Sequence, residues 1–384
     1  MIVPHPNYRL NPSRAIYISG MIDEDLVARL TPEILRLQSA SREPISVYID
    51  SRGGIVYCME SILRLLKLTD QDASPPCRII TAVTSLAASA AADLLSSGDY
   101  AVAYPSTKIL YHGLRTLEKN PLTLELTSTL ANSLRAANDT YAMKLAEQIN
   151  RRFLFRFIMA RHGFVDIREK NCTPNMTDLE CFIEIIKSQL SAEAKNVLEK
   201  ARIRHGRYEK LLDTVFRKSR RSRGKKTLAQ LEANHIKAII AFEVKNNEGD
   251  LSWSFTNRGM SSLVDDFFLW NEYLDDFGSA RLPEWSSMYA RWTVPPEKLR
   301  EIEAIEDKKS RADKFVEAVG PILEPISAFF VALCHTLQEG ENVLTASDAY
   351  WLGIVDEVVG EPLPTERWMA EYREDPKPQD HAQD

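Results

Sequence analysis

The chain has 384 residues, of which 44% are hydrophobic and 27% are charged, and its net charge at pH 7 is -6. This composition is typical of a globular protein with room for two or three domains, and the net acidity argues against a general affinity for nucleic acid or anionic membranes. The N-terminus has no basic-then-apolar signal sequence and no stretch is apolar enough to span a bilayer, so we predict a cytoplasmic protein.

The five cysteines are scattered along the chain without a CxxC pair. This pattern favours reduced thiols over a disulfide scaffold or a zinc site, and we expect neither a metal nor a cofactor. These residues are Cys58, Cys77, Cys172, Cys181 and Cys334.

Strand-like and helix-like segments alternate through the first third of the chain. Short apolar runs predict strands, and apolar residues at helical spacing predict the helices between them. This alternation predicts βαβ units, a mainly parallel sheet and an α/β fold, with chemistry at the carboxyl ends of the strands. The predicted strands are 14–19, 45–50, 78–83, 100–104 and 108–112, and the predicted helices are 24–38, 57–68 and the segment that follows Ser89.

Three of the predicted strand ends carry residues suited to acyl transfer. Ser89 lies where a strand turns into a helix of small residues, so that other backbone can approach its hydroxyl and helix N–H groups point toward it. His112 ends a later strand and is able to take the serine proton, while Gly53 and Gly54 form a tight turn. Each feature also has a structural explanation: close helix packing, a buried histidine, or a simple turn.

Four motifs in order, YIDSRGGIV, TSLAASAAADLLSSG, PSTKILYH and ENVLTASDAYWLGIVDEV, resemble the proteolytic subunit of the Clp protease, a serine peptidase with a crotonase-like fold. The resemblance covers residues 14–114 and 341–359. It implies that Ser89 is the nucleophile and His112 the general base. By the same resemblance, the oxyanion hole is formed by Gly53, Gly54 and Ala90, and the backbone partners of a peptide substrate are Ile55 and Val56.

The third member of the triad departs from the family pattern, because Glu341 stands where the family usually has aspartate. A glutamate is able to orient a histidine, although its longer side chain requires a shifted backbone. Alternatively, Glu341 is a solvated loop residue, and Glu339 or no residue takes this role. Ala90 and Ala91 also replace a larger residue and a glycine of the family motif.

The resemblance divides the chain into a Clp-like core at 1–150, a mainly helical insertion at 151–314, a second part of the core at 315–365 and a disordered tail at 366–384. The core includes a predicted helix at 122–150 that resembles the handle through which two Clp rings meet. A second apolar stripe precedes Glu341, and we expect the two helices to pair as the stem of the insertion. The first stripe contains Leu126, Leu130, Leu134, Ala137, Tyr141, Leu145 and Ile149; the second contains Ile326, Phe329, Phe330, Leu333, Cys334 and Leu337.

Two segments of the insertion have unusual composition. Residues 217–226 include seven basic residues in ten, typical of a solvated loop and, less often, of a contact with nucleic acid or an acidic partner. Residues 253–292 include ten aromatic residues, which favours a small core or a protein-binding face.

The sequence therefore predicts a serine endopeptidase that acts on peptides or unfolded proteins as a homo-oligomeric ring, away from membranes and without nucleic acid. Whether a Clp-type ATPase is a partner stays open, because the segment before the first strand is shorter than in family members that work with this ATPase. The chain has no Walker motif and would not supply ATP-driven unfolding itself. The chain would then work without that ATPase or recruit another partner through residues 253–292. Two alternatives are a catalytically silent oligomerisation scaffold and an acyl-CoA enzyme on the same fold.

Overall fold

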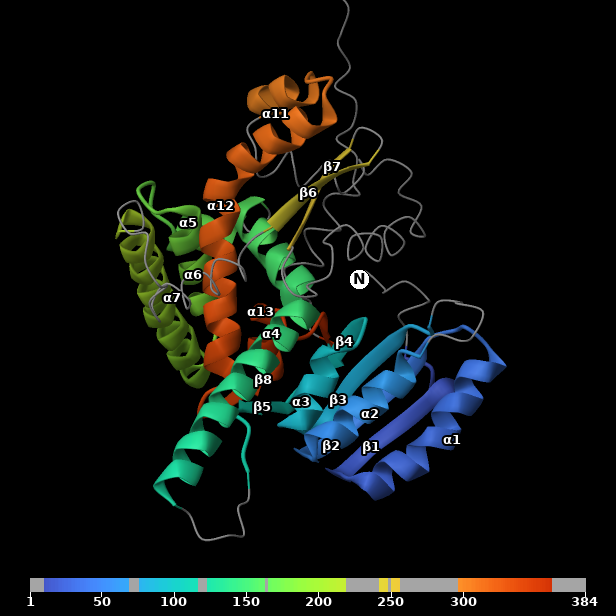
Figure 1. Cartoon of the computed structure of the whole chain (residues 1–384). Coiled ribbons are helices and arrows are strands. Elements are labelled where there is room, and N and C mark those ends of the chain that lie inside the picture. The colour runs from blue at the N-terminus through green and yellow to red at the C-terminus, as the bar shows by residue number, and fades with distance from the viewer. Residues whose placement is uncertain are drawn as a thin grey trace, which may run out of the picture.

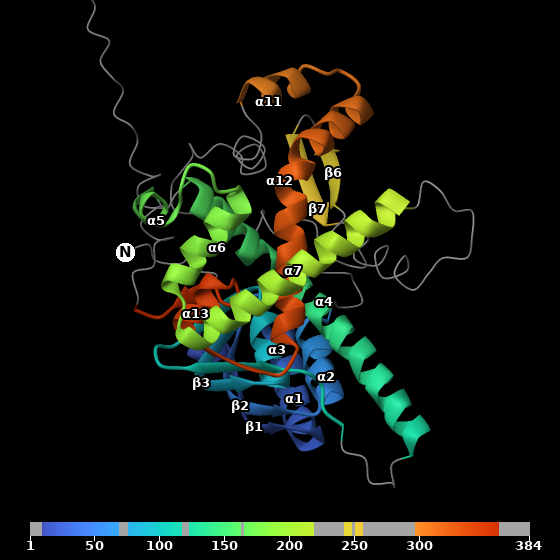
Figure 2. The ribbon, with the colours of Figure 1, turned by 90° about the vertical axis from the view of Figure 1, so that its left-hand side faces the viewer.

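The computed structural model describes residues 10–68, 76–116, 123–162, 165–218, 242–247, 250–255 and 296–360. In these residues a seven-stranded sheet carries the helices α1, α2 and α3 on one face, and a group of longer helices stands beside it (Figures 1 and 2). The predicted α/β fold, with further helices beyond the sheet, is confirmed.

The sheet is built from the segments that the sequence predicted. A short 3-10 turn, Pro12–Arg14, leads into the first strand, and Asp23 caps the first helix by accepting a hydrogen bond from the N–H of Leu26 at 3.0 Å. The elements are β1 (Ala15–Ile22), α1 (Glu24–Ala40), β2 (Ile45–Gly54), α2 (Val56–Leu66), β3 (Ile79–Ala88), α3 (Ala90–Ser96), β4 (Tyr100–Ala103) and β5 (Lys108–His112).

The strand β3 has two neighbours on the same side, which fixes the position of the residues at its end. The strands β1, β2, β3, β4 and β9 (Glu357–Val358) are parallel in that order. The first half of β3 pairs with β4, whereas its second half pairs with β5, with Ala88 opposite Leu110. The strand β5 also pairs, antiparallel, with β8 (Glu341–Thr345). The ends of β3 and β5 and the start of β8 therefore meet.

The long helix α4 (Leu124–His162) begins away from the sheet and then packs into the molecule (Figure 2). Along its predicted apolar face Leu126 and Leu134 are half-buried, whereas Leu145 and Ile149 are buried. The other described elements of this part are α5 (Val165–Asn171), α6 (Asp178–Gln189), α7 (Ala192–Lys218), β6 (Phe242–Asn247), β7 (Asp250–Phe255), α11 (Pro296–Glu303), α12 (Lys308–Leu337) and α13 (Ala346–Trp351).

The helices α4 and α12 pair, as the two apolar stripes predicted. The ring of Phe153 stacks on that of Phe330, with centroids 4.4 Å apart. The helix α6 joins this contact, since Phe182 meets Phe153 edge-on at 5.3 Å and Phe157 at 5.4 Å. Helices from the predicted insertion thus share one hydrophobic core with the sheet.

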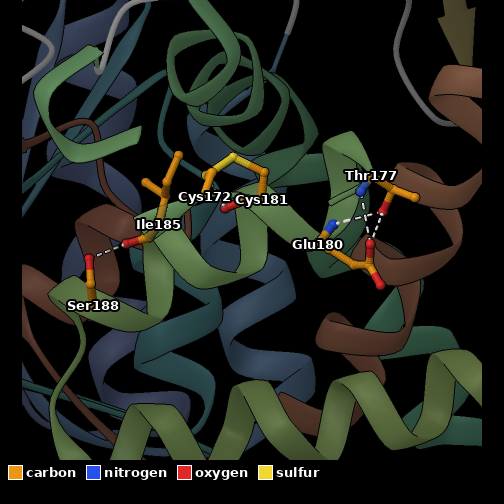
Figure 3. The surroundings of a disulfide bond; sticks show 6 residues. All are labelled: Cys172, Thr177, Glu180, Cys181, Ile185 and Ser188. Carbon is orange, nitrogen blue, oxygen red and sulfur yellow. Dashed lines mark hydrogen bonds between the residues drawn. A yellow bond between two sulfur atoms is a disulfide. The ribbon is translucent and has the colours of Figure 1, made fainter. Parts of the chain in front are cut away.

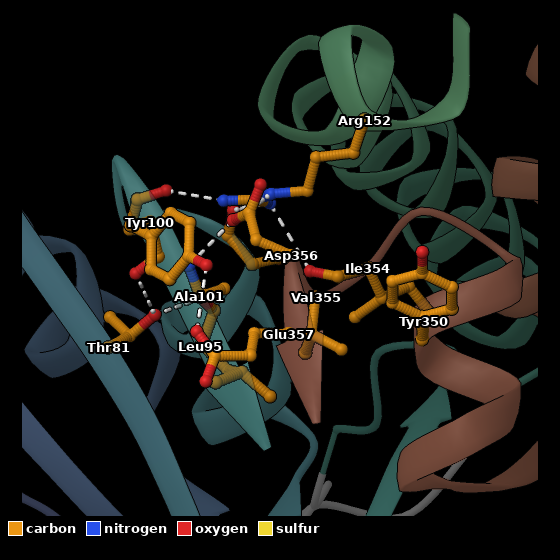
Figure 4. A network of polar contacts seen from close by, with 12 residues as sticks. Thr81, Leu95, Tyr100, Ala101, Arg152, Tyr350, Ile354, Val355, Asp356 and Glu357 are labelled. Atoms are coloured by element: carbon orange, nitrogen blue, oxygen red, sulfur yellow. Dashed lines mark hydrogen bonds and ion pairs between the residues drawn. The ribbon is translucent and has the colours of Figure 1, made fainter. Parts of the chain in front are cut away.

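A buried arginine ties the long helix to both parts of the sheet domain (Figure 4). Arg152 of α4 donates to the Asp356 carboxylate at 2.7 Å and to the carbonyls of Ser96, Gly98 and Ile354 at 3.0, 2.7 and 3.2 Å. The same Asp356 oxygen accepts the N–H of Ala101 at 2.7 Å, so β4, the end of α3 and the C-terminal segment meet at one ion pair. Removal of one partner of such a pair costs about 3–5 kcal/mol, because the other charge stays buried.

The prediction of free thiols is wrong for two of the five cysteines. Cys172 and Cys181 form a disulfide that joins the end of α5 to α6, with their Cα atoms 5.2 Å apart (Figure 3). Between them the chain makes a turn, in which the N–H of Met176 donates to the Thr173 carbonyl at 3.1 Å, and a capping box of Thr177 and Glu180 then starts α6. The other three cysteines are buried free thiols.

Several predicted features lie outside the described residues: most of the basic run 217–226, the aromatic segment beyond Phe255 and the tail 366–384. None of the helices in the described part of the chain has the length and apolar content that crossing a membrane requires. In the same part, no three His, Cys, Asp or Glu side chains come together in a way that would hold a metal ion.

Candidate active site

Ser89 occupies a strained turn between β3 and α3. Its φ of 58° and ψ of -130° place it in a region of backbone space that residues with a side chain rarely adopt. The turn is held by a hydrogen bond from its N–H to the carbonyl of Leu110 at 2.8 Å and by the N–H of Ala92, which donates to the Ser89 carbonyl at 2.8 Å. Such strain is concentrated at functional sites, and it marks Ser89 as the candidate reactive residue.

The two glycines at the end of β2 lie directly against this turn. Gly53 has a φ of +86°, and a Cβ atom there would lie 2.4 Å from the Ala88 carbonyl oxygen, 2.7 Å from Ser89 Cβ and 3.1 Å from the Ala90 nitrogen. A Cβ at Gly54 would lie 2.3 Å from the Ile22 carbonyl oxygen. Only glycine fits at either position, so the backbone of β2 can approach the serine.

The N–H groups predicted for the oxyanion hole differ in their present partners. Gly53 donates its N–H to the Ser51 hydroxyl at 3.0 Å, and this hydroxyl donates to the Gly20 carbonyl at 2.6 Å. Ala90 is the first residue of α3, where the helix itself does not use the N–H. An oxyanion would therefore have to replace Ser51 as the partner of Gly53.

His112 ends β5 and is half-buried. Its Nδ1 lies 2.6 Å from the carbonyl oxygen of Gly113. The following backbone is fixed by Asn138 of α4, which accepts the N–H of Leu114 at 2.8 Å. Since Ala88 pairs with Leu110, Ser89 and His112 end adjacent parallel strands.

The structure places Glu341 directly opposite His112 in the antiparallel ladder between β5 and β8. Residues in such a pair project to the same face of a sheet. The Glu341 carboxylate is nevertheless exposed and bonded to Arg115, and Glu339 is bonded to Arg204 of α7. Neither carboxylate contacts His112, although Glu341 has the better position.

The sequence did not indicate the polar contacts that hold the turn before Glu341. Gln338 donates from Nε2 to the Asp93 carboxylate of α3 at 3.1 Å, and Asn342 donates to the carbonyls of Thr336, Leu337 and Glu339 at 3.0, 3.0 and 2.8 Å. Burial raises the pKa of Asp93 to about 7, although Gln338 and Lys144 act in the opposite direction. An aspartate inside an alanine-rich helix was a visible signal, but its partner is far away in the sequence.

A groove of 610 Å³ lies at the carboxyl ends of β1, β2 and β3 and includes both glycines. The backbone of Ile55, a predicted substrate partner, is already used here: its N–H donates to Ile22 at 2.8 Å, and its carbonyl accepts from Cys58 and Met59 at 3.1 Å. Val56 begins α2, where the helix leaves the first N–H unused. The groove is lined by Ser19, Gly20, Met21, Asp50, Ser51, Arg52, Gly53, Gly54, Ser85 and Leu86.

Residues 5–140 match the family model "Clp protease". A curated relative, the ATP-dependent Clp protease proteolytic subunit of Carsonella ruddii (strain PV), is 30% identical over 101 residues, which are 26% of this chain and 49% of the relative. The chain thus spans about half the length of this relative. A solved mutant ClpP1 of Listeria monocytogenes is 20% identical, with a TM-score of 0.31, over 36% of this chain and 73% of its own.

The family model and the curated relative confirm the resemblance to the Clp protease proteolytic subunit family. The matched residues contain the whole parallel part of the sheet except β9, together with Ser89 and His112.

Proposed function

We propose that the chain is a serine endopeptidase in which Ser89 is the nucleophile. The observation that carries this proposal is the strained Ser89 turn, with the glycine backbone of β2 packed against it. This packing brings the Gly53 backbone of β2 close to the first N–H of α3, at Ala90, beside the serine.

In this mechanism, Ser89 Oγ attacks the carbonyl carbon of the scissile peptide while His112 removes the hydroxyl proton. Nδ1 of His112 lies at the Gly113 carbonyl and donates to it, so Nε2 is the ring nitrogen that accepts the proton. The oxyanion is stabilised by N–H groups among Gly53, Gly54 and Ala90. His112 then protonates the leaving amine, and a water molecule hydrolyses the acyl enzyme by the reverse proton path.

The orienting acid in this proposal is Glu341, which leaves Arg115 and replaces the Gly113 carbonyl as the acceptor of the His112 Nδ1–H. The two residues are already paired across β5 and β8, so this step is a side-chain rotation without a change in register. Ile55 and Val56 follow the glycines at the groove, where Val56 is the better candidate for a backbone contact with the substrate.

A catalytically silent scaffold is a second candidate function. It is favoured by the ion pair between Glu341 and Arg115 and by the Gly53 N–H that is bonded to Ser51, because both contacts occupy groups that the reaction needs.

For assembly, we propose a homo-oligomeric ring that acts on peptides or unfolded proteins in the cytoplasm. The first half of α4 supports this proposal, since it extends from the sheet domain with incompletely buried leucines along one face (Figure 2). Light scattering at micromolar concentration tests this proposal, and a purely monomeric profile would contradict it.

The test of the enzyme is labelling by a fluorophosphonate together with turnover of short unstructured peptides. We expect Ser89→Ala to lose both labelling and turnover, and His112→Ala to lose turnover. Turnover by Glu341→Ala should fall less, since the orienting acid is often the least costly member of a triad to remove. Ser39→Ala, which removes an exposed serine on α1, is the control. Wild-type-like turnover by His112→Ala, or labelling of Ser89→Ala, would contradict the proposed roles of these two residues. If the wild type is neither labelled nor active on peptides, the scaffold is the better explanation.

A further inference from the structure

A second cavity, of 360 Å³, lies between α7 and the turn that leads into β8. It adjoins Gly340, and the next residue, Glu341, stands opposite His112 in the sheet. The cavity is lined by Lys200, Ile203, Arg204, Arg207, Thr336, Glu339 and Gly340.

The charge in this cavity is unbalanced. Arg204 is bonded to Glu339, the single carboxylate of the lining, and also donates to the Tyr208 hydroxyl at 3.4 Å. Lys200 and Arg207 have no ion-pair partner within the described part of the chain. Among the described residues, these two positive charges at the cavity are therefore not compensated by an ion pair.

The helix end beside the cavity does not offset this charge. The last carbonyls of α12, which would repel an anion, are already bonded: Asn342 donates to those of Thr336 and Leu337, and the N–H of Glu339 donates to that of Thr336 at 3.2 Å. Ile203 is 52% exposed and adds an apolar surface next to the two cations.

We propose that this cavity binds a carboxylate of the peptide substrate, either an acidic side chain or the C-terminal carboxylate. The inference rests on the proposed peptidase function for its choice of ligand. A guanidinium and an ammonium beside an apolar side chain suit a carboxylate on a short aliphatic stem. A long polyanion such as nucleic acid fits less well, because the described lining offers two cations outside ion pairs and the chain has a net charge of -6.

The experiment measures peptide binding by the full chain carrying Ser89→Ala, so that it does not depend on turnover. Three labelled peptides of equal length are compared by fluorescence anisotropy: a neutral amidated peptide, the same peptide with one glutamate, and the neutral peptide with a free C-terminal carboxylate. We expect at least one carboxylate peptide to bind about tenfold more tightly than the neutral one, with the difference shrinking at high salt. The peptide that shows the preference identifies which carboxylate is bound.

The double variant Lys200→Gln/Arg207→Gln should bind the three peptides equally. The single variant Arg207→Glu should instead favour a fourth peptide, in which lysine replaces the glutamate. Lys195→Gln, which changes an exposed cation of α7 outside the cavity, should leave the preference for a carboxylate peptide intact. Equal binding of the three peptides, or a preference that survives the paired change, would overturn the inference. Tighter binding of a single-stranded oligonucleotide that is lost in the same pair would also overturn it. If binding behaves as expected while the wild-type chain is not labelled by the fluorophosphonate, the peptidase proposal is wrong and the carboxylate site stands.

Discussion

The turn at Ser89 and the turn before Glu341 are built in different ways. The first is local: glycines and alanines allow β2, β3 and α3 to meet, and its bonds run between neighbouring strands. The second is assembled from distant segments, since Gln338 bonds to Asp93 of α3, and Glu339 to Arg204 of α7.

This difference separates what is fixed in the candidate site from what depends on other parts of the molecule. The strained serine belongs to the sheet domain and needs no contact with α7. The position of the acid depends on α7, which contacts β8, and on α12, which contacts α4 and α7. A chain of this kind is able to keep the nucleophile in place while the acid changes partner.

The strongest test of the local turn is Gly53→Ala. A methyl group there would lie 2.4 Å from the Ala88 carbonyl at a φ of +86°, and it would push the backbone away from Ser89. We expect peptide turnover to fall about 10²–10³-fold, as for the loss of an oxyanion donor. The matched control is Gly206→Ala in α7, where nothing beyond the neighbouring backbone of the helix lies within 4 Å of the added methyl group. Turnover near the wild-type level in Gly53→Ala would show that the glycine backbone does not serve the reaction.

The contact between the two turns is tested through Asp93. Its pKa is raised from 3.8 to about 7 in the folded protein. The contribution of Asp93 to the free energy of unfolding is therefore complete below pH 4, where the carboxyl is protonated, and is lost as the pH rises through 7. A pKa shift of this size corresponds to about 4 kcal/mol of the free energy of unfolding. Because Asp93 is partly accessible to solvent, we expect a change of about 2 kcal/mol.

Asp93→Asn keeps an oxygen for Gln338 but does not ionise. The free energy of unfolding of the wild type, relative to this variant, should therefore fall between pH 4 and pH 8, measured by urea denaturation at each pH. Asp25→Asn, at an exposed position of α1, should show no such trend. A difference between wild type and Asp93→Asn that is the same at every pH would mean that Asp93 ionises normally.

The local turn could be predicted from the sequence because its causes are short-range. Small residues around Ser89, the glycine pair after β2 and the strand that ends at His112 all lie in continuous motifs, and the structure has the last strand at the predicted residues, 108–112. The strands β2 and β3 are longer than predicted, since each continues to its functional turn at Gly54 and Ala88.

The distant contacts left no comparable pattern. Arg115 meets Glu341 across more than half of the chain, and neither residue has a neighbour that would indicate the pair. The Cys172–Cys181 disulfide was likewise not predicted, because a spacing of nine residues does not indicate a pair unless the turn between α5 and α6 is known. Periodicity reports on which face of an element is buried, and it does not report on which polar partner lies there.

The smallest expected effect concerns the ion pair that holds the acid. In the structure Arg115 and Glu341 are both largely exposed, with 62% and 64% of their side-chain surfaces accessible. An ion pair of this kind contributes about 0–1 kcal/mol, so releasing Glu341 with Arg115→Gln should raise kcat/KM by at most about fivefold. The gain should vanish when Glu341→Gln is added, because the amide cannot stabilise a protonated His112. Arg64→Gln, which removes the exposed partner of Glu60 on α2, is the control. If Arg115→Gln lowers activity instead, Arg115 supports the acid in its working position, and the turn before β8 is as fixed as the turn at Ser89.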